Sequence, residues 1–188
     1  MNKKSLLKEL RVFWKENNVP NISDINAQFL RDLIKIKYAQ SILEIWTANW
    51  FSTIHLWSEA EKNNGKVVSI DFSKPSHKMA QENIQKAELE RTVELIFWDA
   101  LEVIPKLDFQ FDFVFIDGMM KSSVDFIKIV WDKTETWWII IIDDVIKFKN
   151  KMTWLDSFLE KNKIKYNILP LDITDGIMMI IKEDITLI

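Results

Sequence analysis

Acidic residues stand at or near the carboxyl ends of the apolar runs that we expect to form strands in this chain. They are Glu44, Asp71, Asp99, Asp117, Asp143 and Asp144. Because ligands of open α/β sheets bind beyond the carboxyl ends of the strands, this distribution predicts one site at one edge of a sheet. Carboxylates crowded at such an edge repel one another unless a cation or the hydroxyl groups of a ligand lie among them. We therefore expect the site to bind a cation, a hydroxylated ligand or both.

Three of these acids have the chemistry of a divalent metal site. Asp117 follows the apolar run 111–116, and Asp143 and Asp144 end the run 138–144. Carboxylate oxygens are hard ligands that suit Mg²⁺, Mn²⁺ or Ca²⁺ and leave coordination positions for water or substrate. The alternative is that Asp143 and Asp144 only cap or hydrogen-bond a loop.

Strand-like and helix-like patterns alternate along the chain and would position these acids. The predicted strands span residues 41–45, 66–71, 93–97, 111–116, 138–144, 165–169 and 176–181, and the predicted helices span 3–16, 23–37, 53–62, 75–87, 100–106, 122–131 and 151–162. This alternation predicts an α/β fold with a mostly parallel sheet. The length of 188 residues suits one domain, 1–188, made of a helical preface at 1–40 and a core at 41–188.

The stretch 41–52, SILEIWTANWFS, lies at the centre of the predicted site. It combines a short buried strand, a turn of small residues and the start of a helix that Ser52 or Thr53 can cap. A strand, a tight turn and a helix N-terminus form the usual nucleotide cradle of an α/β sheet. Such a turn is normally rich in glycine so that its backbone can approach the ligand, yet Trp46 and Trp50 stand in it.

With glycine at those two positions, the stretch resembles motif I of the class I methyltransferases that use S-adenosylmethionine. From about residue 19 to residue 181, the chain resembles more narrowly the small metal-dependent O-methyltransferases related to catechol and caffeoyl-CoA O-methyltransferases. This resemblance implies a Rossmann-like methyltransferase fold with a seven-stranded sheet whose last strand is antiparallel. It also implies helices on both faces, an N-terminal helical preface that covers the cofactor, and assembly as a homodimer.

The resemblance also assigns roles to residues of the predicted site. It places S-adenosylmethionine against Glu44, Trp46, Trp50, Ser52, Asp71, Asp99, Ala100 and Asp117, with Asp71 at the ribose and Asp99 near the adenine. For Asp99 the alternative is that it only caps the next short helix.

By the same resemblance, the divalent cation, Mg²⁺ before others, would bind Asp117, Asp143 and Asp144. The metal would hold two neighbouring substrate oxygens and lower the pKa of the attacking hydroxyl. The family often has a lysine general base three residues after the first metal aspartate. Here that position is Met120 and the lysine follows as Lys121, so Lys121 and Asp117 are the candidate catalytic residues.

Tryptophan and glycine are used in unusual proportions. The chain has 9 Trp and only 3 Gly, and reading the tryptophans as glycine would bring glycine near its usual share of about 7%. Five tryptophans stand where this fold would use glycine: Trp46, Trp50, Trp98, Trp137 and Trp138. We hypothesise that the source reads UGA as glycine where this translation reads tryptophan. In the helix-like segments, either residue is credible at Trp14, Trp57, Trp131 and Trp154, and the alternative is a lineage that acquired tryptophan at every site.

Composition narrows the function. The chain has no cysteine, which excludes disulfides and thiolate metal sites, and no apolar run of membrane-spanning length. These features favour a cytoplasmic protein, and the resemblance implies that it is an O-methyltransferase. The net charge of −3 favours a small-molecule hydroxyl substrate over a hydroxylated tRNA base. Two alternatives are a non-catalytic methyltransferase-like binding protein, if the tryptophans are real, and a nicotinamide-dependent oxidoreductase, since Asp71 follows the cradle at a suitable distance.

Overall fold

The computed structural model describes residues 3–17, 21–48, 50–118, 120–172 and 176–187. Helices and strands alternate through most of it. The helices are α1 (Lys3–Asn17), α2 (Asp24–Lys37), α3 (Phe51–Ala60), α4 (Lys74–Ala87), α5 (Ala100–Val103), α6 (Ser123–Lys133) and α7 (Thr153–Lys161). The strands are β1 (Ser41–Ile45), β2 (Lys66–Asp71), β3 (Val93–Phe97), β4 (Phe111–Ile116), β5 (Thr134–Ile142), β6 (Tyr166–Leu169) and β7 (Ile177–Ile181).

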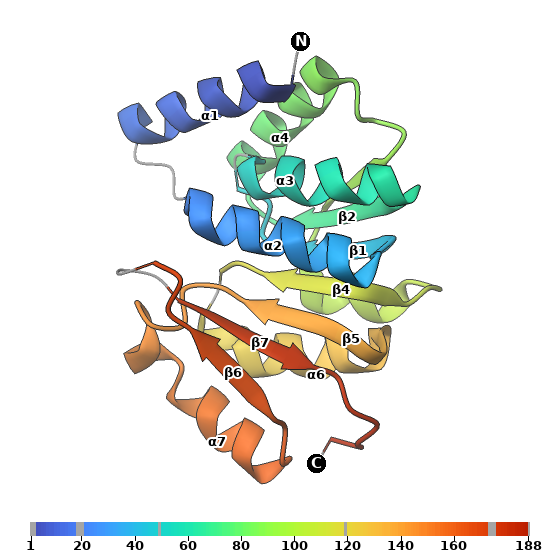
Figure 1. Ribbon diagram of the computed structural model, residues 1–188, viewed down its shortest axis with the longest axis vertical. Coiled ribbons are helices and arrows are strands. Elements are labelled where there is room, and N and C mark those ends of the chain that lie inside the picture. The colour runs from blue at the N-terminus through green and yellow to red at the C-terminus, as the bar shows by residue number, and fades with distance from the viewer. Residues whose placement is uncertain (1–2, 18–20, 49, 119, 173–175, 188) are drawn as a thin grey trace.

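The seven strands form one sheet in the order β3-β2-β1-β4-β5-β7-β6 (Figure 1). Strands β1 to β5 run parallel to one another, whereas β7 runs antiparallel to both β5 and β6. The mostly parallel α/β sheet and its antiparallel last strand are therefore confirmed. The chain moves outward in opposite directions from β1 and β4, which makes the gap between their carboxyl ends the switch point at which such sheets bind ligands.

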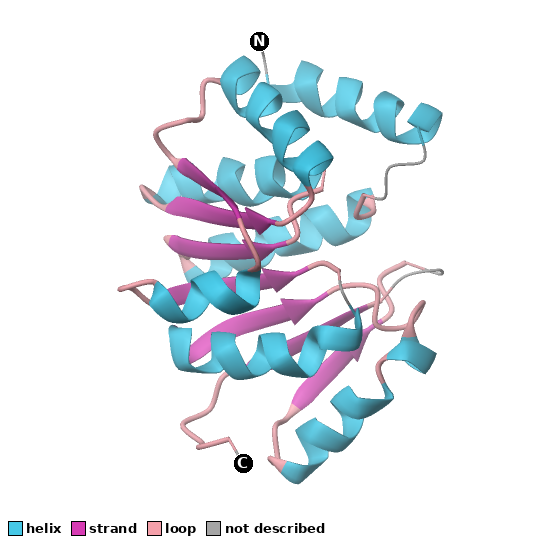
Figure 2. Ribbon diagram, turned by 180° about the vertical axis from the view of Figure 1, so that it is seen from behind, coloured by secondary structure: helices cyan, strands magenta, loops and turns pink. Residues whose placement is uncertain are grey.

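Two hydrophobic clusters cover the two faces of the sheet. Side chains of α1 to α4 belong to one cluster, and those of α5 to α7 belong to the other. Figure 1 and Figure 2 show the molecule from these two opposite sides. Successive residues of β1 alternate between the clusters, with Ile42 in the first and Leu43 in the second, as strand geometry requires. The central strands are apolar because both of their faces are buried. The preface helices belong to the first cluster through Leu6, Leu30 and Ile34.

Two element boundaries differ from the prediction in ways that affect the site. Helix α3 begins at Phe51, before the predicted start, and its N-cap is Trp50. Strand β5 begins at Thr134 and ends at Ile142, so Asp143 and Asp144 lie beyond the strand rather than in it. Among the residues that the structure describes, no helix is long and apolar enough to cross a membrane.

Candidate cofactor and metal site

Backbone hydrogen bonds extend the parallel ladder past the ends of the central strands. The Trp46 N–H donates to the Ile70 carbonyl at 2.8 Å, and the Asp117 N–H donates to the Ile45 carbonyl at 3.0 Å. The Asp143 N–H likewise donates to the Ile116 carbonyl at 3.0 Å. These bonds bring the residues that follow β1, β4 and β5 to one edge of the sheet, as the sequence predicts.

Glu44 lies beneath the motif I turn and is fully buried. Its carboxylate accepts hydrogen bonds from the hydroxyls of Ser52 and Ser69, each at 2.5 Å, and from that of Thr53. Burial raises the pKa of Glu44 to about 7, although the three hydroxyls favour its charged form. In this structure Glu44 and Ser52 are hydrogen-bonded to each other, and this bond links β1 to the first turn of α3.

The prediction that Ser52 or Thr53 caps α3 is wrong. Helix α3 starts at Phe51, and its N-cap residue, Trp50, makes no side-chain capping bond. Ser52 and Thr53 therefore lie inside the first turn, and their hydroxyls face Glu44 instead of the helix N-terminus. In a cap these hydroxyl oxygens would accept from backbone N–H groups, whereas here the hydroxyls donate to a buried carboxylate, a strong acceptor where no water competes.

Asp71 ends β2 and is 2% exposed. One carboxylate oxygen accepts from the Ala48 N–H at 2.9 Å and the other from the Ser73 N–H at 2.6 Å. Burial raises the pKa of Asp71, while these backbone donors oppose the rise. A carboxylate offers about four lone-pair positions, so Asp71 can still accept hydrogen bonds from a ligand while it anchors the turn.

Asp99 and Ala100 lie across from this turn at the start of α5. Asp99 is the N-cap of α5, and its carboxylate accepts from the Leu101 N–H at 2.9 Å, so its capping role is confirmed. Ala100 is buried and packs in the second hydrophobic cluster. Together they form one wall of a small cavity whose other lining residues include Trp46, Asp71, Phe72 and Trp98.

The indole of Trp46 fills much of the space between these groups. Trp46 has a φ of 82°, and its ring stands edge-on to Phe72 with 5.2 Å between the ring centroids. A Cβ placed on Gly118 would lie 2.8 Å from the indole, so the ring lies directly against that glycine. The remaining cavity is about 10 Å³, hardly room for one water molecule. The polar groups of this half fit an adenosyl ligand, but the volume left by Trp46 does not.

The acids beyond β4 and β5 have protein partners of their own. Asp143 is buried, and one of its carboxylate oxygens accepts from the side-chain amide of Asn26 in α2 at 3.2 Å. Asp144 has a φ of 59°, and its carboxylate pairs with the Lys147 ammonium at 3.2 Å. In this structure Asp144 therefore makes only the local loop contact that the alternative to a metal site predicts. Asn26 is not among the residues that the sequence predicts for the site. The one feature that could have pointed to it is its polar amide on the otherwise apolar, buried side of α2.

The predicted metal ligands do not form a coordination cluster in this structure. Across the described residues, no three His, Cys, Asp or Glu side chains lie close enough together to hold a metal ion. Asp117 and Asp143 lie at adjacent strand ends, but Asp144 turns to Lys147. Lys121 lies in the short helix Met120–Ser122 that precedes α6, and its side chain is exposed.

Comparisons with known proteins agree with this fold. A model of the O-methyltransferase family matches residues 1–182. A catechol O-methyltransferase of Mycobacterium tuberculosis is 31% identical over 127 residues, which cover 67% of this chain and 57% of that protein. A putative caffeoyl-CoA O-methyltransferase of Arabidopsis thaliana is 28% identical over 151 residues, 76% of this chain and 64% of that protein. The chain thus spans somewhat more than half the length of the curated relatives that it matches.

Solved structures share the whole architecture. An O-methyltransferase from Bacillus cereus, solved in complex with SAH, superposes with a TM-score of 0.82 at 25% identity, covering 95% of this chain and 91% of that one. A putative caffeoyl-CoA O-methyltransferase from Staphylococcus aureus has a TM-score of 0.83 at 22% identity, with coverage of 93% and 91%, and shares the fold. The sheet order, the cradle at β1 and the match along residues 1–182 place the chain in the O-methyltransferase family.

Proposed function

We propose that the protein transfers a methyl group from S-adenosylmethionine to a hydroxyl oxygen of a small molecule. The observation that carries this proposal is the arrangement of Asp71, Asp99 and Asp117 around the motif I turn in a chain of the O-methyltransferase family. Support also comes from the Bacillus cereus relative, which was solved with SAH.

With glycine at position 46, the groups around the turn would suit the adenosyl part of the ligand. Asp71 would accept hydrogen bonds from the ribose hydroxyls, because the Ala48 and Ser73 N–H groups already orient its carboxylate. Asp99 and Ala100 would border the adenine. S-adenosylmethionine supplies an electrophilic methyl group, so the protein's contribution is positioning and electrostatics. Lys121 remains the candidate base.

We further infer that Asp117, Asp143 and Asp144 hold a divalent cation, Mg²⁺ first. Support comes from their hard oxygen atoms and from the adjacent strand ends that carry Asp117 and Asp143. Asp144 would have to exchange Lys147 for the cation. When bound, the cation would lower the pKa of the substrate hydroxyl. Titration with Mn²⁺, followed by electron paramagnetic resonance, tests this directly, and Asp143→Asn should weaken binding.

The cofactor part of the proposal has a matched pair of variants. Asp112 resembles Asp71, since its carboxylate also accepts from two backbone N–H groups, those of Gln40 at 2.6 Å and Ser41 at 3.0 Å, but it lies at the opposite edge of the sheet. In a chain that carries Trp46→Gly, Asp71→Asn should lower the affinity for S-adenosylhomocysteine at least tenfold, roughly 1.4 kcal/mol. Asp112→Asn should lose stability but keep that affinity. Titration calorimetry measures the affinity of both variants for the ligand. A Trp46→Gly chain that does not bind the ligand would contradict the proposal.

The substrate class is tested with labelled S-adenosylmethionine and three acceptors: vicinal diols such as catechols, phenols with one hydroxyl, and tRNA. We expect Mg²⁺-dependent transfer to the diols, because a cation would hold two neighbouring oxygens. Label in tRNA would favour the tRNA-base alternative. Ligand binding without transfer to any acceptor would favour a non-catalytic binding protein. The expected homodimer is tested separately by light scattering.

A further inference from the structure

We propose that the natural chain carries glycine at positions 46, 50 and 137 and tryptophan at positions 57 and 131. The starting observation is backbone conformation. Tryptophan supplies 9 of the 188 residues, yet it supplies three of the nine non-glycine residues with positive φ in the described structure. Their φ angles are 82° at Trp46, 83° at Trp50 and 70° at Trp137. Glycine adopts this region without strain, whereas a bulky side chain rarely does.

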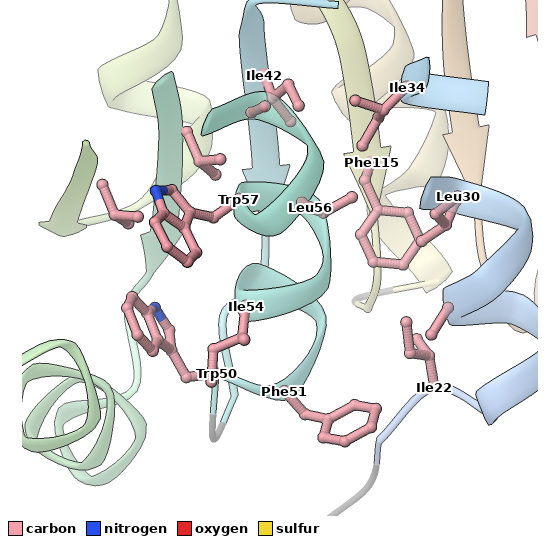
Figure 3. Packing of buried hydrophobic residues seen from close by; sticks show 14 of the residues in the cluster. Ile22, Leu30, Ile34, Ile42, Trp50, Phe51, Ile54, Leu56, Trp57 and Phe115 are labelled. Atoms are coloured by element: carbon pink, nitrogen blue, oxygen red, sulfur yellow. The ribbon is translucent and has the colours of Figure 1, made fainter. Parts of the chain in front are cut away.

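Position 50 shows a conflict beyond its φ angle. Trp50 is the N-cap of α3, makes no capping bond and is fully buried. Its indole N–H has no hydrogen-bond partner among the described residues, which is unfavourable for a buried donor. Trp57 projects from the same side of α3 (Figure 3), but it lies within the regular helix, and its indole N–H donates to the Thr92 hydroxyl at 2.5 Å.

Position 137 shows the same backbone problem without burial. Trp137 lies in β5 where the pairing with β4 is irregular: Phe111 pairs with Thr134, but Phe113 pairs with Ile139. Extra residues in a strand are a common place for glycine in the left-handed region. The Trp137 side chain is 66% exposed, so packing offers little to offset the strain.

At position 46 the side chain also fills the space at the centre of the candidate site. Its indole lies against Gly118 and Phe72 and leaves a cavity of about 10 Å³ beside Asp71 and Asp99. Glycine at this position would relieve the backbone and open that cavity toward an adenosyl ligand. This consequence for binding rests on the proposed function, whereas the argument from φ does not.

The other tryptophans divide according to the same criteria. Trp131 is 3% exposed in α6, and its indole N–H donates to the Ile185 carbonyl at 3.0 Å, so tryptophan suits its position as it suits Trp57. Neither Trp98 nor Trp138 has a positive φ, so the backbone argument does not extend to them. Recoding at those two positions stays a prediction from composition.

The decisive test reads the codons and the residues at the same positions. We expect UGA at codons 46, 50 and 137 and UGG at codons 57 and 131. Tandem mass spectrometry of peptides from the protein purified from its own source should give glycine residue masses at the first three positions and tryptophan masses at the other two. Tryptophan at any of the first three, or glycine at 57 or 131, overturns the proposal.

A second test uses recombinant protein and two exposed tryptophans. Trp154 is 77% exposed in α7 and does not have a positive φ, so it matches Trp137 in exposure but not in backbone. Trp137→Gly should raise the melting temperature by roughly 2–4 °C. Trp154 lies in the first turn of α7, where glycine costs less than in a helix interior, so Trp154→Gly should lower the melting temperature by a smaller amount. A loss in both variants overturns the backbone argument. Trp50→Gly is less suitable here, because relief of the backbone and loss of a buried indole change the melting temperature in opposite directions.

The two proposals fail separately. Glycine masses at 46, 50 and 137 in a protein that does not bind S-adenosylhomocysteine would uphold this inference and reject the proposed function. Tryptophan masses in a protein that binds the ligand would do the reverse.

Discussion

The acids at the carboxyl ends of β1 and β2 and those at the carboxyl ends of β4 and β5 differ in their hydrogen-bond partners. We call these two regions the β1–β2 half and the β4–β5 half of the site. Beside β1 and β2, Glu44 accepts from three hydroxyl donors and Asp71 from two backbone donors. The indole of Trp46 leaves little space beside Asp71 and Asp99. Beyond β4 and β5, Asp143 and Asp144 are bonded to the side chains of different segments and do not converge.

This difference separates two requirements of the site. Under the proposed function, the β1–β2 half already holds its polar groups and would need only volume for an adenosyl ligand. The β4–β5 half has suitable donor atoms but would need a cation to gather them, because like charges do not converge unaided. We therefore expect substitutions in the first half to act mainly on stability and ligand affinity, and those in the second half to act mainly on cation affinity.

The largest effect is expected at Glu44. Glu44→Ala would leave the hydroxyls of Ser52, Thr53 and Ser69 without their acceptor in a dry interior and would create a cavity. At pH 5.5, where Glu44 is mostly neutral, we expect the free energy of unfolding in urea to fall by about 4 kcal/mol. Glu44→Gln, which keeps the volume and an acceptor, should lose clearly less. Equal losses would show that the hydroxyl cluster is not what matters.

The second effect is a pH dependence with a defined sign. Because burial raises the pKa of Glu44 from 4.5 to about 7, the folded state binds a proton that the unfolded state releases between these values. Stability from Glu44 is thus fully present below pH 4.5 and is lost as the pH rises through about 7, by about 3 kcal/mol in total. Glu44→Gln should lack this slope. Parallel curves for the two proteins would contradict the burial of an ionisable group at this position.

Much of the fold could be predicted because its signals are local. The run Phe111–Ile116 is apolar on both faces, and the structure gives it the predicted bounds as a central strand. Strands β1, β2 and β3 also have their predicted bounds. The acids at the strand ends follow from these bounds, since parallel strands bring their carboxyl ends to one edge.

The errors and omissions come from contacts between residues of different elements. The local sequence predicts that Ser52 caps the helix, but its hydroxyl donates a hydrogen bond to Glu44 on the preceding strand. Asn26 and Asp143 are 117 residues apart, and their hydrogen bond leaves no local pattern in the sequence. Tryptophan at position 46 could be noted as unusual from the sequence, but its φ angle and the volume that it fills required the structure.

The amide of Asn26 gives a test of the second half. Asn26→Asp would place a carboxylate where a donor now faces the buried Asp143. We expect a loss of about 2 kcal/mol at pH 8 that shrinks at pH 5.5, because one acid of the pair would then be protonated. Asn26→Leu should lose less at pH 8 and show no such recovery. Equal losses in the two variants at both pH values would argue against repulsion at Asp143.

The smallest change in stability, and the sharpest test of the comparison, is expected at Lys147. Lys147 and Lys151 both lie over the Phe148 ring, at 5.0 Å and 4.4 Å from its centroid, but the carboxylate of Asp144 pairs with Lys147. Because this pair is partly exposed, Lys147→Ala should change the unfolding free energy by no more than about 0.5 kcal/mol.

If Asp144 is a cation ligand held back by Lys147, the same variant should bind Mn²⁺ about twofold more tightly, as expected for removing a competing ion pair of this strength. Lys151→Ala removes an equivalent ring contact and should leave the Mn²⁺ affinity unchanged. Equal Mn²⁺ affinities in the parent protein and both variants would mean that Asp144 is a loop residue. The β4–β5 half would then have lost its third proposed ligand, while the β1–β2 half would stand unaffected.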